Sequence, residues 1–467
     1  MTQAQSLIES SSYRSAKNEL LKTITEASQK IRGVRPPSGS PEVKEAYAKL
    51  LQDFAHDKGR EPYFPYLSSG IGAGPYVELM DGSVKMDLIT GIGVNFFGHS
   101  HPELMAEMID AVPSDLFQGN LQPGIEAQKL LSTLLAEVSG KSRLKHGWIT
   151  TCGTMANENA LKMLRQKKAP ATKILAFKDC FCGRSTAMAE LTDNAGYRQG
   201  QPVYGEVEYL SFYSPTLGLE ASVKKTLGEM QEHFARYPGK FCALMMEPIQ
   251  GEGGFNAAPR EFYVRVFEEA KKAGLMIWLD EIQTFGRTGE LFAFQKLGLD
   301  EYVDIVTVAK MLQASVFLWT EELTPKPGLV AGTFAGPTAG LRAATKSLEI
   351  LKRDGYLGPQ GKIEKLSAHF VKNLSRMRET TCQGMVGEIR AVGGMIAFLP
   401  FEGKMDDCKV VLKKLFDLGV VAFYCGHGPY LIRMLPPLGA MTEADIDVAC
   451  GLIEKALHEV KASKAEK

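Results

Sequence analysis

Two short, mainly apolar runs, each followed by a charged residue, constrain the fold of this chain most strongly. Leu275 to Leu279 leads directly into Asp280, and Val303 to Ala309 leads into Lys310. Short apolar runs bounded by turns are typical of strands that are buried on both faces of a sheet. The sequence therefore predicts two buried strands, one ending in an acid and the other in a lysine.

An acid and a lysine in these positions meet two needs of pyridoxal phosphate (PLP) chemistry. A lysine forms a Schiff base with the cofactor aldehyde. An acid keeps the pyridine nitrogen protonated, so that the ring accepts electrons from the substrate. In the alternative interpretation Asp280 caps a strand and Lys310 is a solvated strand end, and these residues alone favour neither.

Further apolar runs alternate with helical patterns through the middle of the chain. The runs lie at 147–151, 173–178 and 242–247, with helices expected from Thr154 and over 260–273. This alternation predicts an α/β fold built on a mostly parallel sheet. Sites in such sheets lie at the carboxyl ends of strands, where we expect Thr151 to Thr154, Glu247, Asp280 and Lys310.

The pattern differs at the two ends of the chain. Residues 1–40 predict an amphipathic helix followed by a turn-rich segment. After Gly336, a long helical region over 338–381, candidate strands at 388–401, 420–424 and 430–435, and a helix over 442–460 predict an α+β domain. We therefore expect an N-terminal segment (1–85), a large domain built on the sheet (86–336) and a C-terminal α+β domain (337–467); the resemblance given below implies that the first contributes to the small domain and to the entry segment and that the second binds PLP.

The charge balance and the cysteine spacing argue against several classes of protein, namely those that bind nucleic acid, membranes or metals and those held together by disulfides. The chain has 54 Lys and Arg against 54 Asp and Glu, so nothing in its charge indicates binding to nucleic acid or to an anionic membrane. Residues 1–18 lack the apolar core that a signal peptide requires, and we expect no apolar run long enough to span a bilayer. The eight cysteines lack metal-ligand spacing, so we expect no metal site, no disulfide framework and a reducing, cytoplasmic location.

Several other residues suit a cofactor site, but each also has an ordinary explanation. Gly153 and Thr154 stand between a strand and a helix, where a phosphate binds or a threonine simply caps the helix. Phe181 could stack on a flat ring or belong to the core. Arg184 could bind a carboxylate or lie on the surface. Gly251-Glu252-Gly253-Gly254 is a flexible turn bearing one acid.

A collinear set of motifs joins these residues. The segments are Gly91–Asn95, Gly98–Pro102, Cys152–Glu158, Phe181–Ser185, Glu247–Gly254, Asp280–Gly289, Thr307–Lys310, Gly332–Gly336 and Ile432–Leu438. Through them, the chain from Asp81 to Leu438 resembles the class III (ornithine/4-aminobutyrate-type) aminotransferases of PLP fold type I. The resemblance implies a PLP-dependent aminotransferase with a large, mostly parallel domain and a smaller α+β domain.

The resemblance also implies roles around the cofactor. Lys310 would hold PLP as a Schiff base and then move a proton between substrate and cofactor carbons. Asp280 would pair with the ring nitrogen, Gln283 would reach the phenolic oxygen, and Phe181 would stack on the ring.

For the phosphate, the resemblance implies a cradle formed by Gly153 and Thr154. Thr333 of a second subunit would complete that cradle. Each site would then be incomplete in a monomer, so we expect a homodimer.

Substrate roles follow from three further matches. Arg184 would bind one carboxylate of the substrate. Arg433 would bind another, and would pair with Glu252 when it is not in use. This set favours transfer of the terminal amine of an ω-amino or diamino acid (lysine, ornithine, acetylornithine or 4-aminobutyrate type) to 2-oxoglutarate by a ping-pong mechanism. The alternative for Glu252 and Arg433 is a structural ion pair.

The chain departs from the family pattern near the expected cofactor. Cys182 replaces a histidine, Met155 an often-present glutamate, Met311–Ser315 a glycine-rich run, and Pro337-Thr338 an Asn-Pro pair; one glycine is missing before Phe285. These changes leave two alternatives to the ω-aminotransferase. One is another reaction of the family, a decarboxylating transamination or an aminomutation. The other is a non-catalytic relative that keeps the fold.

Overall fold

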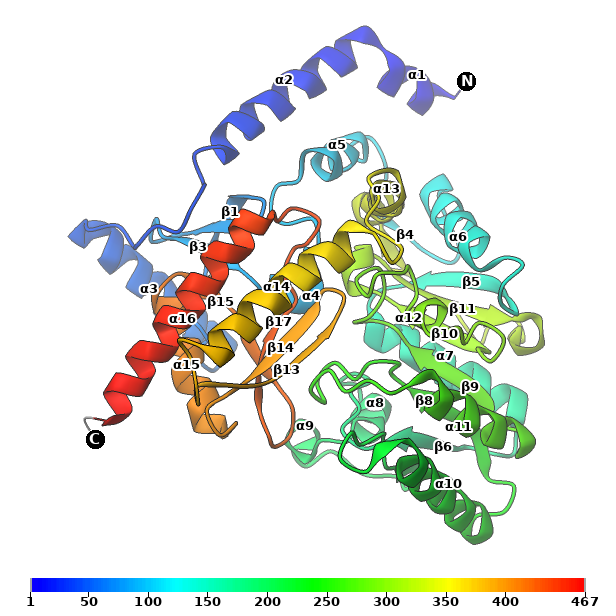
Figure 1. Cartoon of the computed structure of the whole chain (residues 1–467). Helices are drawn as coiled ribbons and strands as arrows, with labels where there is room; N and C mark the ends of the chain where they lie inside the picture. Colours follow the sequence, from blue (N-terminus) through cyan, green and yellow to red (C-terminus); the bar gives the residue numbers. More distant parts are fainter. Residues whose placement is uncertain (1, 466–467) are drawn as a thin grey trace. The chain divides into compact units, whose positions relative to one another are not determined.

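The computed structural model describes residues 2–465 and contains two compact units (Figure 1). One unit consists of the residues up to Asp110 together with those from Pro359 onward, and the other is Ala111–Gly358. These limits differ from the sequence-based boundaries at 86 and 336. The reason is packing: helix α5 (Pro102–Asp110) lies against α2 (Ser11–Ser28), and α13 (Thr338–Arg353) lies against α6 (Ile125–Val138).

The unit Ala111–Gly358 is built on a seven-stranded sheet in the order β5-β11-β10-β9-β8-β6-β7. The strands are β5 (Leu144–Thr150), β6 (Lys173–Phe177), β7 (Val207–Leu210), β8 (Phe241–Met246), β9 (Met276–Asp280), β10 (Ile305–Val308) and β11 (Ser315–Thr320). Only β11 runs antiparallel to its neighbours, so the predicted mostly parallel sheet is confirmed.

Helices bury this sheet on its faces, which explains its apolar strands. Every residue of β8, β9 and β10 is buried. Helix α7 (Gly153–Lys168) packs across β8 to β11, and α11 (Arg260–Lys272) packs on β8 and β9. The remaining elements of this unit are β4 (Phe117–Gln118), α8 (Thr186–Leu191), α9 (Ala195–Arg198), α10 (Gly218–Arg236), α12 (Ala293–Lys296), η1 (Lys310–Leu312), η2 (Glu321–Leu323) and β12 (Gly336–Pro337).

The other unit is α+β. It holds two four-stranded sheets, β1-β2-β3-β15 and β13-β14-β17-β16, with an apolar core that includes Phe398, Leu412 and Ile453. Its strands are β1 (Ser68–Ala73), β2 (Tyr76–Leu79), β3 (Val84–Asp87), β13 (Val386–Val392), β14 (Met395–Pro400), β15 (Val420–Val421), β16 (Phe423–Cys425) and β17 (Leu431–Met434). Its other helices are α1 (Gln3–Glu9), α3 (Pro41–Lys58), α4 (Thr90–Gly93), α14 (Lys362–Glu379), α15 (Met405–Asp417) and α16 (Glu443–Ala465).

Two predicted helices are each divided in the structure. The helical region 338–381 forms α13 and α14, because Gly355 and Gly358 adopt positive φ angles and Pro359 follows them. The N-terminal helix is split into α1 and α2 at Ser10, whose extended backbone ends α1 and whose hydroxyl caps α2. Within residues 2–465, no helix is long and apolar enough to cross a membrane.

Candidate active site

The carboxyl edge of the large sheet collects polar residues from adjacent strands. Asp280 is the last residue of β9, and Lys310 follows β10 closely. The two strands are parallel neighbours, and Thr307 of β10 lies opposite Asp280 in their register. Glu247 directly follows β8, the next strand in the sheet. The sheet topology therefore brings together three charged residues that are far apart in the sequence.

Asp280 is buried and held by hydrogen bonds from two directions. Its Oδ2 accepts a bond of 2.7 Å from Nδ2 of Asn157, and its Oδ1 accepts one of 2.9 Å from the N–H of Ile282. Burial raises the pKa of Asp280 to about 6, while these hydrogen bonds and the charge of Lys310 oppose the rise. The carboxyl group is therefore ionised above that pH, and it can accept a proton donor.

Asn157 joins four elements of the site. Besides Asp280, its Nδ2 donates to the carbonyl of Cys182 at 2.7 Å, and its Oδ1 accepts a bond of 2.8 Å from Oγ1 of Thr307. Asn157 is fully buried on α7. Since all these bonds are inside the protein, Asn157 fixes α7, β9, β10 and the loop around Cys182 relative to one another.

Lys310 occupies a backbone conformation that is uncommon for a residue with a side chain. Its φ is +50°, at the start of the short 3-10 helix η1, and Gln313 at the other end has φ +62°. Such left-handed positions cost roughly 1–3 kcal/mol and are frequent at functional sites. Met311 is buried beside Gly286, and a Cβ added to Gly286 would lie 2.4 Å from the sulfur of Met311. Met311 is the first residue of the segment in which the family resemblance implies a glycine-rich run.

Glu247 organises the loops around the site. Its two carboxylate oxygens accept the N–H groups of Phe181 and Gly251, each at 2.9 Å. Burial and the nearby Asp280 raise the pKa of Glu247 to about 8. This side chain therefore supports the loop that carries Phe181 as well as the glycine-rich loop at Gly251.

Gly153 and Thr154 form the first turn of α7. The helical hydrogen bonds begin with the N–H of Ala156, which donates to the carbonyl of Cys152 at 3.0 Å. The preceding N–H groups project from the helix end, as in anion sites. Gly183 lies against this turn, and a Cβ on it would stand 2.6 Å from Oγ1 of Thr154. Only glycine permits the loop to approach the helix end so closely.

Gln283 is buried, and within the described residues its Oε1 has no hydrogen-bond partner. The side-chain amide of Gln283 lies against Gly251, and a Cβ added to Gly251 would lie 2.6 Å from this amide. A buried acceptor without a partner is costly unless a ligand supplies a donor. Gln283 therefore has the property expected of a ligand-contacting residue.

Arg184 is exposed, and aromatic rings hold its guanidinium. The group lies 4.0 Å from the ring centroid of Tyr197 and 5.6 Å from that of Phe181. The Phe181 and Tyr197 rings meet edge to face at 5.5 Å. Stacking on Tyr197 orients the guanidinium while leaving its N–H groups available to a carboxylate.

Three of the predicted site residues belong to other segments of the chain. Glu252 is half-buried in the loop after β8, whereas Arg433 is fully buried on β17 of the other compact unit. Thr333 is exposed in a segment held to β4, where Asn120 donates to the carbonyl of Gly332 at 2.9 Å.

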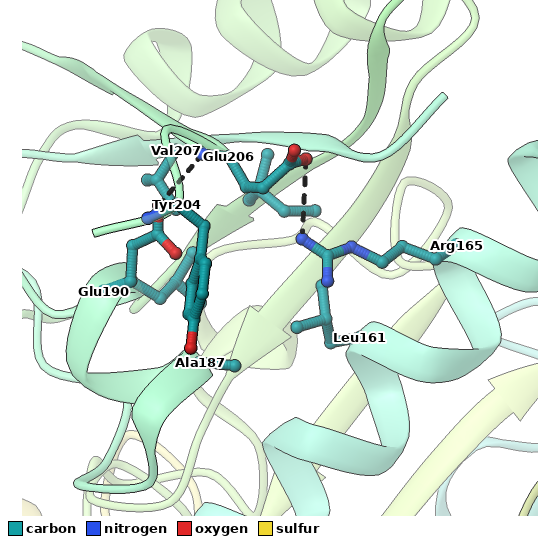
Figure 2. A pocket seen from close by; sticks show the side chains of 9 residues that line it. Leu161, Arg165, Ala187, Glu190, Tyr204, Glu206 and Val207 are labelled. Atoms are coloured by element: carbon teal, nitrogen blue, oxygen red, sulfur yellow. Dashed lines mark hydrogen bonds and ion pairs between the residues drawn. The ribbon is translucent and has the colours of Figure 1, made fainter. Parts of the chain in front are cut away.

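A cavity of about 150 Å³ in the same unit is separate from these residues (Figure 2). Glu190 accepts the N–H groups of Tyr204 and Glu206 there, and Arg165 lies 3.7 Å from the Glu206 carboxylate. These polar groups bind one another and hold the loop before β7. None of the predicted site residues lines this cavity.

Sequence reasoning assigned no role to Asn157 or Thr307. Both lie inside motifs quoted above, but their contacts join residues as many as 150 positions apart. One signal was available, since Asn157 is a polar residue on the face of α7 that also carries Ala156, Ala160 and Leu164. A polar residue on such a buried face needs a partner.

Comparisons with known proteins agree with this geometry. The sequence model of the family Aminotransferase class-III matches residues 61–457. The chain is 32% identical to the acetylornithine aminotransferase of Bacillus subtilis over 82% of its own length and 93% of that enzyme. It is 33% identical to the acetylornithine aminotransferase of Myxococcus xanthus, over 75% and 82% of the two chains. Among solved structures, a lysine aminotransferase from M. tuberculosis superposes with a TM-score of 0.76 at 22% identity, covering 88% of this chain and 99% of that one.

Proposed function

Since this chain belongs to the class III aminotransferases, we propose that it moves the terminal amino group of an ω-amino or diamino acid to 2-oxoglutarate. The donor is of the lysine, ornithine, acetylornithine or 4-aminobutyrate type, and the two half-reactions follow a ping-pong order. The observation that carries the chemistry is the position of Asp280 and Lys310 at the ends of adjacent parallel strands, joined through Asn157 and Thr307.

The cofactor of this family is PLP, and the residues of this site fit it. The buried Oε1 of Gln283 lacks a protein partner within residues 2–465, and a phenolic O–H would satisfy it. The first turn of α7, approached closely by Gly183, suits a phosphate. Asp280 supplies a buried carboxylate for a protonated ring nitrogen. We assign PLP contacts to Gly153, Thr154, Phe181, Asp280, Gln283 and Lys310.

Bound PLP supplies an electron sink for the carbanion that forms next to the substrate nitrogen. Lys310 would hold the cofactor and, once substrate releases it, its Nζ atom would remove the proton from the substrate carbon, which leaves that carbanion, and would return the proton later in the exchange. Asp280 stays ionised while it faces a cation, because an opposite charge lowers a carboxyl pKa. Asn157 holds that carboxylate in one orientation, so no reorganisation is needed during the reaction.

Arg184 is the residue of this unit that we assign to the substrate carboxylate. Its guanidinium is stacked on Tyr197 beside the ring of Phe181, which we assign to the cofactor, so an acid bound by Arg184 would lie next to that ring. We assign Arg433 to the second carboxylate of 2-oxoglutarate and Glu252 to its partner when a donor with an uncharged tail is bound. The acetylornithine and lysine aminotransferases among its relatives support this class of donor.

We further propose that the enzyme is a homodimer in which Thr333 completes the neighbouring site. Exposed apolar side chains flank the paired strands β4 and β12 close to Thr333, and they include Phe334, whose ring meets Phe117 at 5.2 Å. Leu116 and Leu121 are 82% and 92% exposed. So much exposed apolar surface in one region is typical of a protein interface.

We place this dimer in a reducing compartment, the cytoplasm. All eight cysteines are free thiols in the structure, and seven of them are buried. Buried thiols that stay unpaired are usual in intracellular proteins.

The visible absorption spectrum of the purified holoenzyme tests the donor assignment. Amino donors are added singly, and one ω-amino donor should convert the cofactor band to that of the pyridoxamine form. The Lys310→Ala variant should lose this conversion. A cofactor band that no donor of the panel changes would contradict the substrate assignment while leaving the PLP site intact.

A further inference from the structure

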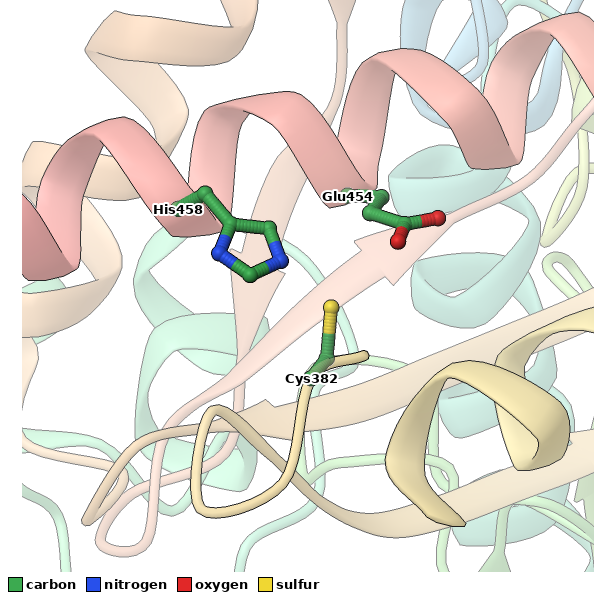
Figure 3. A group of neighbouring side chains, drawn as sticks. All are labelled: Cys382, Glu454 and His458. Atoms are coloured by element: carbon green, nitrogen blue, oxygen red, sulfur yellow. The ribbon is translucent and has the colours of Figure 1, made fainter. Parts of the chain in front are cut away.

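Three potential metal ligands meet in the α+β unit, outside the motifs that carry the family resemblance. One ligand atom from each of Cys382, Glu454 and His458 lies within 4.8 Å of the other two (Figure 3). Cys382 lies in the turn between α14 and β13, whereas Glu454 and His458 belong to α16. No cysteine spacing reveals this cluster, because the fold and not the local sequence brings the thiol to the helix.

The local structure fixes the directions of the three side chains. Glu454 and His458 are four residues apart on a helix, so they share one face. Figure 3 shows both pointing toward the turn from which the Cys382 sulfur rises. That turn is held by hydrogen bonds from the N–H of Cys382 to the carbonyl of Met377 at 2.6 Å and from Met385 to Cys382 at 2.9 Å. The thiol is therefore buried and positioned before any ligand binds.

Neither helix residue is engaged elsewhere. Within residues 2–465, no hydrogen bond or ion pair holds the carboxylate of Glu454 or the imidazole of His458. The Cys382 sulfur accepts one long hydrogen bond, of 3.9 Å, from the hydroxyl of Thr381. Another histidine and acid of the same unit differ in this respect. His369 lies 2.7 Å from Asp447, and Asp447 also accepts a bond from Asn373. That second pair is satisfied by protein groups alone.

We propose that Cys382, Glu454 and His458 bind one zinc ion. A thiolate, an imidazole and a carboxylate are the ligand types that Zn²⁺ uses in proteins, with bonds of about 2.0–2.3 Å. Such bonds place ligand atoms roughly 3.5 Å apart in a tetrahedral site, so rotations of the exposed histidine and the half-buried glutamate close the remaining gap. The thiolate and the carboxylate together balance the charge of the ion.

Binding proceeds with loss of one proton. The Cys382 S–H bond breaks, a sulfur–zinc bond forms, and the proton passes to solvent. Burial and, to a smaller extent, Glu454 raise the pKa of this thiol, while Thr381 and Lys461 oppose the rise. A water molecule completes the fourth position. The ion then links the turn after α14 to α16 and stabilises this unit apart from catalysis.

The test uses the PLP-loaded enzyme, stripped with a chelator and titrated with Zn²⁺ in a calorimeter. X-ray absorption at the zinc edge then identifies the bound atoms. We expect one ion per chain, with one sulfur at about 2.3 Å and the remaining ligands nitrogen or oxygen at about 2.0 Å.

Two variants and one control separate this site from surface binding. Cys382→Ser should remove the sulfur from the absorption spectrum. His458→Gln changes only an exposed side chain, so the protein should remain folded, and its zinc affinity should fall at least about tenfold. His369→Gln should bind zinc like the unaltered protein. Absence of binding, a spectrum without sulfur, or equal affinity in the His458 variant would overturn the proposal.

Discussion

The side-chain amide of Asn157 donates a 2.7 Å hydrogen bond to the carboxylate of Asp280, across 123 residues of sequence. The same amide group also donates to the carbonyl of Cys182, and its oxygen accepts from Thr307. We propose that Asp280 faces the cofactor nitrogen and that the first turn of α7 binds the phosphate. Because Asn157 lies on α7, this one helix would position both ends of the proposed cofactor site.

Replacing Asn157 by alanine should lower activity without unfolding the protein. The change removes a hydrogen bond to a buried charged group, an interaction of about 1.5–3 kcal/mol, so we expect kcat/KM to fall on the order of tenfold to a hundredfold. Asn159→Ala is the matched control, because Asn159 is buried on the same helix, and within the described residues the side-chain hydrogen bond from this helix to Asp280 comes from Asn157. Equal losses in both variants would show that Asn157 acts through stability alone.

Activity should also depend on pH through Asp280. Its pKa is raised to about 6 in the protein without cofactor, and a bound cation lowers it. The acid side of the kcat/KM profile should therefore lie at or below about 6. In Asn157→Ala it should move to higher pH, because a hydrogen bond to the ionised form is lost. A profile that Asn157→Ala does not shift would refute this role.

Glu247 should make the cofactor-free protein less stable as pH rises. Its pKa is about 8 in the fold against an ordinary value of 4.5, so the folded state holds more protons than the unfolded state between these values. Stability contributed by the protonated form is then lost over that window, by up to about 1.4 kcal/mol per pH unit. Unfolding by urea at several pH values measures the slope. Glu247→Gln should show a flatter slope, because glutamine does not titrate, and an unchanged slope would contradict the assignment.

The contribution of Thr333 to a neighbouring site can be tested by mixing two defective enzymes. Lys310→Ala keeps Thr333, and Thr333→Ala keeps Lys310, so a mixed dimer would contain one intact site if the threonine serves its partner. Random exchange makes about half of the dimers mixed, and activity should recover to about a quarter of the wild-type value. If Thr333 serves its own subunit, mixing restores nothing.

Arg184→Lys should weaken substrate binding more than turnover. Lysine cannot form the bidentate pair with a carboxylate, and it stacks less well on Tyr197. We expect KM for the donor to rise about tenfold or more while kcat changes little. This pattern results when an interaction is lost that stabilises the bound substrate and the transition state equally. Arg165→Lys, at the separate cavity beside Glu206, serves as the control and should leave KM unchanged.

Much of the fold follows from local patterns. The strands that end in Asp280 and Lys310 are apolar because helices cover them on both faces, and that pattern is visible without a structure. The strand β11 was not predicted. It has the composition of any buried strand, but it begins at Ser315, the last residue of the segment where the family resemblance implies a glycine-rich run. Its antiparallel direction depends on its pairing with β5 and β10, which no local signal encodes.

The site was predicted less completely than the fold. Motifs marked Asp280, Lys310 and Gly153 because chemistry needs those residue types at those positions. The supports, Asn157 and Glu247, act through hydrogen bonds to other elements, and only the folded chain reveals those bonds. The same reason hides Cys382, Glu454 and His458, which are brought together solely by packing of a turn on a helix.

The most direct test of the proposed reaction follows one nitrogen atom. The holoenzyme is incubated with 2-oxoglutarate and with ornithine, acetylornithine, lysine or 4-aminobutyrate labelled with nitrogen-15 at the terminal amine, and the glutamate formed is analysed by mass spectrometry. Our account predicts labelled glutamate from at least one of these donors, and none with Lys310→Ala. Unlabelled glutamate from a diamino donor, or no glutamate from any of the four, would contradict it.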